Sequence, residues 1–185
     1  MTMPVLVTGG AGFIAANLIQ RLLELDREVI AVDNLSRGCV ENLAHVVSHP
    51  SFQLVVADIS DRDAFFSAVD KAVAGRTIDA VWHLAANSDI PGGVADPCID
   101  FRDTFLTTFN TLLLMKERSI RQMYFASSSA IYGDLGDVAL TEEVGPLLPI
   151  SNYGAMKLAS EAQISATAEG HLDRALLFRF PNVVG

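Results

Sequence analysis

A glycine-rich turn between an apolar run and a helical pattern constrains this chain more than any other feature. Residues 10–15 read Gly-Ala-Gly-Phe-Ile-Ala and fit the pattern G-x-G-x-x-[G/A], in which a strand precedes the turn and a helix follows it. Without a Cβ at Gly12, the backbone can approach a pyrophosphate closely. The helix that begins near Phe13 would offer its free N–H groups to that anion. The turn therefore predicts a dinucleotide-binding site.

An acidic residue at the expected distance supports this prediction. Asp33 ends the next apolar run, where its carboxylate can accept hydrogen bonds from the adenosine ribose hydroxyls. The same charge would repel a 2′-phosphate, which favours NAD over NADP. Arg37 argues the other way, because an arginine in this loop could bind that phosphate. A lone glycine pattern could equally be an ordinary turn, but strand, turn, helix, strand and acid in this order favour the cofactor.

Short apolar runs alternate with helical patterns along the whole chain. The candidate strands are Pro4–Thr8, Glu28–Asp33, Phe52–Val56, Ala80–Leu84, Gln122–Ser127 and Arg174–Phe180. The candidate helices are Phe13–Asp26, a short one near Val40–Val47, Arg62–Ala74, Ile99–Arg118 and Tyr153–Glu169. This alternation indicates an α/β fold with a doubly wound parallel sheet, so we expect one three-layer α/β/α domain over residues 1–185.

The composition argues against several classes of protein. The formal net charge of −9 would repel nucleic acid and anionic membrane surfaces. No run reaches the roughly 18 apolar residues of a membrane span. The two cysteines and four histidines are scattered, so we expect no metal site. We therefore expect a cytoplasmic protein with reduced thiols.

The predicted chemistry depends on Tyr153 and Lys157, which lie four residues apart on a predicted helix. Residues i and i+4 share a helix face, so the ammonium can lie beside the phenol and lower its pKa from the usual value of about 10. Such a phenol can take a proton from a substrate hydroxyl while hydride leaves the same carbon for a nicotinamide. An isolated Tyr-x-x-x-Lys is usually a surface pair. The three serines at residues 127–129 end a predicted strand, where a hydroxyl could bind the substrate oxygen, and they favour the chemical interpretation.

Three other positions each have two interpretations. Asp58 could accept a hydrogen bond from the adenine amino group, or it could belong to a helix N-cap. The small residues Ala85 and Ala86 would let a flat cofactor ring pass close to the end of a strand. His83, beside them, is more often a buried and hydrogen-bonded histidine than a catalyst.

Together, these segments resemble the extended short-chain dehydrogenase/reductase family, especially its nucleotide-sugar epimerases of the UDP-galactose 4-epimerase type. The matching segments follow the family order along nearly the whole chain: residues 8–18, 32–36, 82–87, 125–133, 153–157 and 179–185. The resemblance implies a Rossmann-like fold with bound NAD. In such epimerases the C4 hydroxyl is oxidised, the keto sugar rotates, and hydride returns to its other face.

The resemblance also implies roles for particular residues. Tyr153 would be the base, Lys157 its partner and a ribose ligand, and Ser129 the catalytic hydroxyl, aligned through Ser-Ala-Ile-Tyr-Gly. Ser129 and Asn182 would contact the substrate, a nucleotide sugar and most simply a UDP-sugar. The expected cofactor-binding residues are Gly9, Gly10, Gly12, Phe13, Ile14, Asp33, Asn34, Asp58, Ile59, Leu84, Ala85, Ala86, Ser127, Tyr153 and Lys157. Many relatives form homodimers through a helix pair, for which Ile99–Arg118 and Tyr153–Glu169 are the candidates.

The chain departs from the family pattern at several places. Ala15 replaces the third glycine, and Thr104 stands where a cofactor-proximal asparagine is expected. The serine segment lacks the Asp-Glu pair of related dehydratases, which disfavours dehydration. Family members are longer, and this chain stops directly after an apolar strand. We therefore expect a truncated chain that lacks its C-terminal substrate-binding domain, binds NAD weakly and has little or no epimerase activity alone.

Two other functions stay open at this stage. The chain could be a non-catalytic NAD-binding or sensing module, or part of a reductase, decarboxylase or dehydratase acting on related sugars. The complete Ser/Tyr/Lys set favours an epimerase over a sensor, because a sensor has no need for an acidic phenol. The sequence leaves the sugar itself open.

Overall fold

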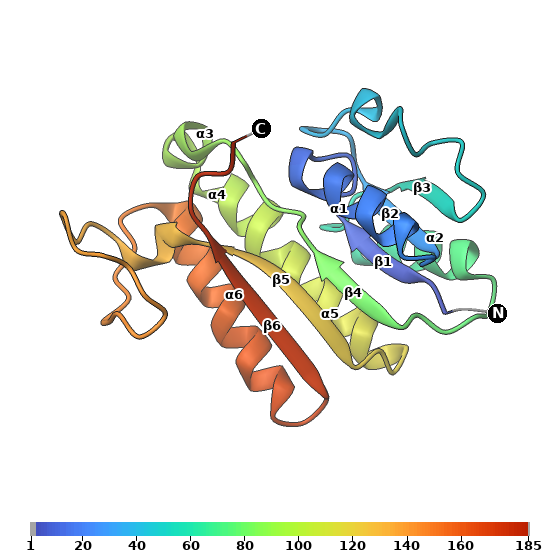
Figure 1. Ribbon diagram of the computed structural model, residues 1–185. Coiled ribbons are helices and arrows are strands. Elements are labelled where there is room, and N and C mark those ends of the chain that lie inside the picture. Colours follow the sequence, from blue (N-terminus) through green and yellow to red (C-terminus); the bar gives the residue numbers. More distant parts are fainter. Residues whose placement is uncertain (1–2, 185) are drawn as a thin grey trace.

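Six parallel strands form one sheet through the centre of the molecule (Figure 1), a computed structural model that describes residues 3–184. The strands are β1 (Val5–Thr8), β2 (Val29–Asp33), β3 (Phe52–Val56), β4 (Ala80–His83), β5 (Gln122–Ser128) and β6 (Arg174–Phe180). Their order across the sheet is β3-β2-β1-β4-β5-β6. The direction of winding reverses between β1 and β4, and ligands of such sheets bind beyond the carboxyl ends of the strands at this switch point.

Helices cover both faces of the sheet. α1 (Phe13–Glu24) and the 3₁₀ turn Val40–Leu43 pack on one face. α2 (Arg62–Val73), α5 (Thr107–Glu117) and α6 (Asn152–Ala168) cover the other, which is the far side of the sheet in Figure 1. Two short helices, α3 (Ile90–Ala95) and α4 (Pro97–Asp100), and a π-helical stretch, Phe101–Leu106, lead into α5. The predicted doubly wound, Rossmann-like α/β fold is confirmed.

Most predicted elements agree with the structure, but the helices differ in two places. The helix expected near Val40–Val47 is only the 3₁₀ turn. The helix expected over Ile99–Arg118 is divided into α4, the π-helical stretch and α5.

Helix α3 was not predicted, because its sequence contains a proline and two glycines. It forms because Pro91 suits the start of a helix and because the Asp89 side chain caps it, accepting a hydrogen bond from the Gly92 N–H at 2.9 Å.

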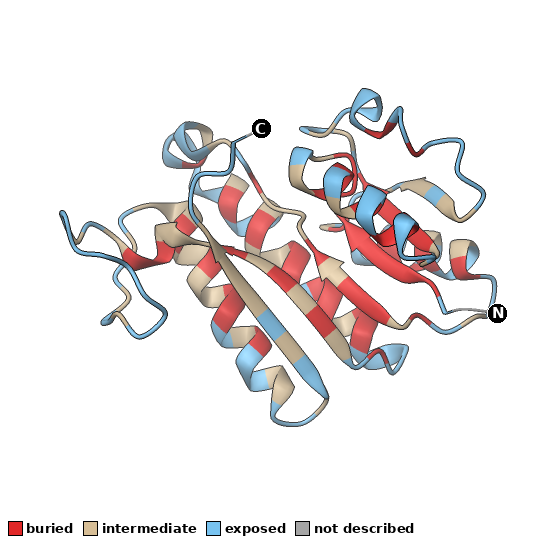
Figure 2. Cartoon of the chain, in the orientation of Figure 1, coloured by how far each residue is buried: buried red, intermediate tan, exposed pale blue. Residues whose placement is uncertain are grey.

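The two sides of the sheet are buried to different degrees (Figure 2). Every residue of β1 and β2 is buried, whereas β6 has only half-buried and exposed residues. On the near face of the sheet in Figure 1, none of the helices in residues 3–184 covers β5 and β6. An aromatic stripe occupies this face: Trp82 stacks on Tyr124, with ring centroids 4.3 Å apart, and on Phe178 at 6.0 Å.

Within residues 3–184, every helix is too short or too polar to cross a membrane.

Candidate active site

A cleft of about 660 Å³ lies beyond the carboxyl ends of the strands, over the switch point. Its walls come from the turn after β1, the loops after β2, β3 and β4, the end of β5, the start of α6 and the segment after β6. Fifteen predicted site residues line it: Gly9, Gly12, Phe13, Ile14, Asp33, Asn34, Asp58, Ile59, Leu84, Ala85, Ala86, Ser127, Tyr153, Lys157 and Asn182. Gly10 and Ser129 are not among the lining residues.

The glycine turn after β1 has a different requirement at each glycine. Gly9 has a φ of +67°, and a Cβ on it would lie 2.7 Å from the Ala85 backbone nitrogen. Gly10 faces away from the cleft, and a Cβ on it would lie 2.6 Å from the Ala31 Cβ, so it permits close packing on β2. At Gly12 only the Gly9 carbonyl oxygen comes within 4 Å of such a carbon. Gly12 therefore leaves backbone open to the cleft.

The N-terminus of α1 fits a pyrophosphate. The helix has no side-chain cap and no acidic residue in its first turn, and Gly12, Phe13, Ile14 and Ala15 line the cleft. The first N–H groups of a helix lack partners within the helix and carry its positive dipole end. An anion is favoured at this position, next to the open backbone of Gly12.

Asp33 links the glycine turn to the loop after β2. Its Oδ2 accepts a hydrogen bond from the Ala11 N–H at 2.9 Å, and its Oδ1 accepts one from the Leu35 N–H at 2.7 Å. Each carboxylate oxygen can accept a second hydrogen bond, so these contacts orient Asp33 without preventing a ribose contact.

Asp58 lies in the wall formed after β3. Its Oδ1 accepts hydrogen bonds from the N–H and the hydroxyl of Ser60. Burial raises the pKa of Asp58, but these two hydrogen bonds, the Asn34 side chain and the charge of Arg102 together leave the pKa below its usual value. Asp58 therefore has a local structural role as well as a place in the cleft, and Asp61 provides the cap of α2.

Tyr153 and Lys157 project from the first turns of α6, whose N-cap is Ser151. Lys157 is almost fully buried, and its Nζ donates to the Ala126 carbonyl at 2.6 Å and lies 5.8 Å from the centre of the Tyr153 ring. Burial lowers the pKa of Lys157 to about 7, against the opposing charge of Glu161. Both side chains of the predicted pair thus reach the same cleft.

The pKa of Tyr153 differs from the sequence-based expectation. Burial raises it above its usual value, the Ser128 side chain opposes this rise as a hydrogen-bond partner, and the charge of Asp100 adds to it. Burial of Tyr153 therefore outweighs the lowering that the sequence analysis expected from Lys157, whose ammonium donates to the Ala126 carbonyl.

The three serines after Ala126 have three different environments. The Ser127 hydroxyl donates to Glu161 Oε1 on α6 at 2.5 Å. Ser128 lines the cleft, and its Oγ accepts a hydrogen bond from the Ala130 N–H at 3.1 Å. Ser129 begins a 3₁₀ turn, Ser129–Tyr132, outside the cleft lining. Because successive strand residues face opposite sides of a sheet, strand alternation could have indicated different side-chain partners for Ser127 and Ser128, although both residues line the cleft.

A buried polar network behind the cleft was not predicted. Arg179 on β6 donates to both carboxylate oxygens of Glu161, at 3.1 and 2.9 Å, and to the Tyr132 hydroxyl at 3.0 Å. Through Glu161 it reaches Ser127, so it joins β5, β6 and α6 beside Lys157. No sequence spacing signals this network, because its members lie far apart in the chain.

Two further predicted positions have structural surroundings. His83 is fully buried, with Nδ1 2.6 Å from Thr8 Oγ1 and Nε2 3.0 Å from Thr108 Oγ1, and burial lowers its pKa to about 3. It is the buried, hydrogen-bonded histidine that the sequence analysis favoured. Thr104 is buried outside the cleft lining and accepts a hydrogen bond from the Asn87 N–H, whereas Thr107 lines the cleft.

Known proteins share this fold and much of this sequence. The chain is 32% identical over 182 residues to a putative UDP-glucose 4-epimerase of Methanocaldococcus jannaschii, covering 98% of the chain and 56% of that protein. A crystal structure of a UDP-galactose 4-epimerase matches 99% of the chain and 57% of its own length, with a TM-score of 0.84 at 40% identity. The UDP-glucose 4-epimerase of Thermus thermophilus, solved in complex with NAD, matches 96% of the chain and 54% of its own length, with a TM-score of 0.83 at 32% identity.

The chain spans about half the length of the curated relatives that it matches. The sequence model of the NAD dependent epimerase/dehydratase family matches residues 5–185. The predicted cofactor, NAD, is the one in the family description, and the glycine turn, the start of α1 and Asp33 fit it. On this evidence, the chain belongs to the NAD dependent epimerase/dehydratase family.

Proposed function

We propose that this chain is the cofactor-binding part of a nucleotide-sugar epimerase. The observation that carries the proposal is that Tyr153, Lys157 and Ser128 line the same cleft as Gly12 and Asp33. A cleft with one end suited to a dinucleotide and a phenol, an ammonium and a hydroxyl at the other end suits reversible oxidation of an alcohol.

In the proposed reaction, the residues of this chain bind and orient the cofactor and the sugar, and they move one proton. Bound NAD supplies the hydride acceptor and donor. Tyr153 takes the proton of the sugar hydroxyl and later returns it, and Ser128 hydrogen-bonds the reacting oxygen. We assign this role to Ser128 in place of Ser129, because Ser128 lies in the cleft. A positive charge brought beside Tyr153 would lower the pKa that burial raises.

The proposed substrate is a nucleotide sugar of the UDP-sugar class, on which the named relatives act. Asn182 supports this proposal, because it follows β6 and lines the cleft together with Phe180 and Val183. We propose that the 185 residues alone bind NAD but have little epimerase activity, since they span only about half of such enzymes.

The test uses a longer protein that contains this chain, assayed for interconversion of UDP-sugars with bound NAD. Tyr153→Phe and Ser128→Ala are each expected to lower turnover by about 100-fold or more. Ser129→Ala is the matched control and is expected to retain most of the activity. If no nucleotide sugar is interconverted, and Tyr153→Phe changes no activity, the proposal is wrong.

A sensing module or a reductase, decarboxylase or dehydratase would give other outcomes. A sensor would bind NAD in calorimetry without hydride transfer to any sugar nucleotide. A reductase would consume reduced cofactor in stoichiometric amounts, whereas an epimerase would show no net change in the absorbance of NADH.

We also propose a homodimer formed through the α5 and α6 helix pair, extended by the π-helical stretch that precedes α5. Phe101 and Phe105 in that stretch and Phe109 in α5 follow one another at intervals of four residues, and Phe101 and Phe109 are 52% and 37% exposed. Such an aromatic stripe suits a partner surface. Light scattering of the wild type and of Phe109→Glu tests this proposal.

The exposed, unpaired thiols of Cys39 and Cys98 suit the proposed cytoplasmic location.

A further inference from the structure

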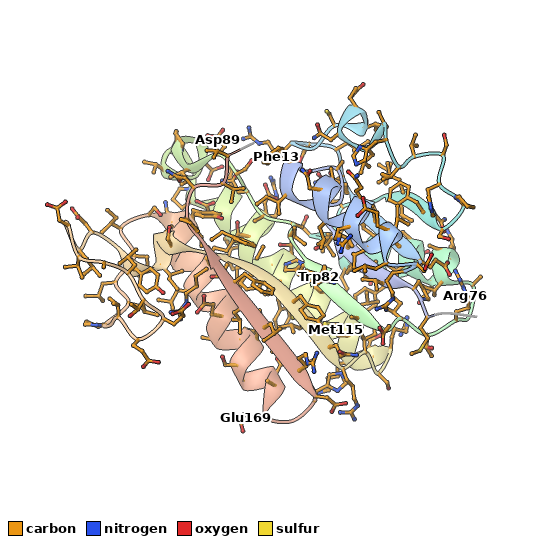
Figure 3. All side chains as sticks on the ribbon, viewed as in Figure 1. Phe13, Arg76, Trp82, Asp89, Met115 and Glu169 are labelled. Carbon is orange, nitrogen blue, oxygen red and sulfur yellow. The ribbon has the colours of Figure 1, made fainter. Side chains whose placement is uncertain are left out.

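An ion pair bridges two loops at the rim of the cleft. Arg37 lies in the loop after β2, and Asp89 precedes α3. The Arg37 Nη2 is 2.7 Å from the Asp89 Oδ2. Arg37 lines the cleft together with Asn34, Ser36 and Asp33, the residue predicted to bind the adenosine ribose. In Figure 3, Asp89 appears at the same end of the molecule as Phe13, the first residue of α1. The pair thus joins an arginine of the cleft lining, four residues after Asp33, to a carboxylate from another loop.

Hydrogen bonds fix the position of Asp89, the partner of Arg37 in this ion pair. Its Oδ1 accepts a hydrogen bond from the Gly92 N–H, and its own N–H donates to Asn87 Oδ1, both at 2.9 Å. The Asn87 amide in turn donates to the Oδ1 of Asp100, which is fully buried, at 2.8 Å. Arg37 is therefore bound to a carboxylate whose position is fixed by a chain of hydrogen bonds leading into the core.

We propose that Asp89 is a specificity residue for the cofactor, because it holds Arg37 away from the position of a 2′-phosphate. This inference rests on dinucleotide binding in the cleft. An arginine in the loop after β2 is the residue type that accommodates the 2′-phosphate of NADP. Binding NADP would require Arg37 to leave Asp89, whereas binding NAD would leave the pair intact. Asp33 acts in the same direction, by repelling the phosphate.

The test is isothermal titration calorimetry of the chain with NAD and with NADP. Asp89→Asn removes the charge but keeps a residue that caps helices well, so α3 is expected to stay folded. We expect this variant to bind NADP about 1.4- to fivefold more tightly, because Asp89 holds Arg37 only through an exposed ion pair. Its affinity for NAD is expected to stay the same. Asp89→Ser, which can also cap the helix, is expected to give the same gain.

The matched control is Arg37→Gln. In that background, Asp89→Asn is expected to give no gain in NADP affinity, since the arginine that it would release is gone. An equal gain in both backgrounds would contradict the inference, because it would reflect only the loss of a negative charge. A chain that binds NAD but shows no gain for NADP in Asp89→Asn would also contradict it. Absence of binding of both dinucleotides would overturn the proposed function together with this inference.

Discussion

The two ends of the cleft differ in which part of the chain shapes them, the backbone at one end and side chains at the other. At the nucleotide end, β1, β2 and α1 shape the site mainly with backbone: Gly9 and Gly10 lie where a Cβ would clash, and Gly12 leaves its backbone open to the cleft. At the chemical end, β5, β6 and α6 shape it with buried polar side chains that satisfy one another, as Arg179 and Glu161 do. The nucleotide end should therefore be sensitive to added atoms, and the chemical end to lost partners.

The largest expected effect tests the nucleotide end. Gly9→Ala is expected to lower the free energy of unfolding by about 2–5 kcal/mol, because it adds left-handed backbone strain and crowding against Ala85. Gly75→Ala is the matched control: Gly75 also has a positive φ, of +81°, but nothing lies within 4 Å of its added carbon. It is expected to cost about 1–2 kcal/mol. Urea unfolding measures the loss of unfolding free energy in both variants. Equal losses would show that the close approach of Ala85 is not the reason for a glycine at position 9.

The next effect tests the chemical end. Arg179→Met is expected to lower the free energy of unfolding by about 2–3 kcal/mol, because it leaves Glu161 buried without its cation. Arg21→Met breaks an exposed pair with Glu24 and is expected to have a much smaller effect on stability. Thermal and urea unfolding measure both. If Arg179→Met lowers the free energy of unfolding no more than the control does, the network does not stabilise the fold.

A pH effect should arise where the two ends meet, at His83. Its pKa is about 3 in the folded chain and 6.5 as a reference for the unfolded chain, so the unfolded state binds the proton first as the pH falls. Stability is therefore lost from about pH 6.5 downward, by about 2 kcal/mol between pH 7.5 and pH 5. Unfolding curves at both pH values, for the wild type and for His83→Asn, isolate this contribution from that of the carboxylates. An identical pH dependence in the two proteins would contradict the neutral, buried state of His83.

The smallest effect separates two adjacent serines. Ser127→Ala is expected to cost about 1–2 kcal/mol of stability, because it removes a buried hydrogen bond to Glu161. Ser128→Ala is expected to cost less, about 0.5–1 kcal/mol, because it loses only the hydrogen bond from the Ala130 N–H at the start of a 3₁₀ turn. Differential scanning calorimetry compares them, and the reverse order would show that the faces of β5 have been assigned wrongly.

Sequence reasoning succeeded where the backbone sets the structure and was weaker where distant side chains meet. The first 33 residues contain the apolar run, the glycine turn, the helical pattern and the acidic residue in order, so the fold of the nucleotide end could be predicted from local sequence. The Arg179–Glu161–Ser127 network joins residues from three elements, and only the sheet order brings them together. The assignment of the catalytic hydroxyl to Ser129 rested on resemblance and stays a prediction, as does Ser128, because the two positions differ only by the register at which β5 ends. Helix α3 was missed because Asp89 and tertiary contacts override its glycines.

The aromatic stripe on the half-open face gives the chain a built-in optical probe. Trp82 is the only tryptophan in the sequence, and it stacks on Tyr124 and Phe178 two residues before Leu84, which lines the cleft. Its emission should respond when β4, β5 and β6 separate during unfolding, and when reduced dinucleotide nearby absorbs the emitted light. Ultraviolet excitation of unlabelled protein could thus follow both folding and cofactor occupancy from a single site.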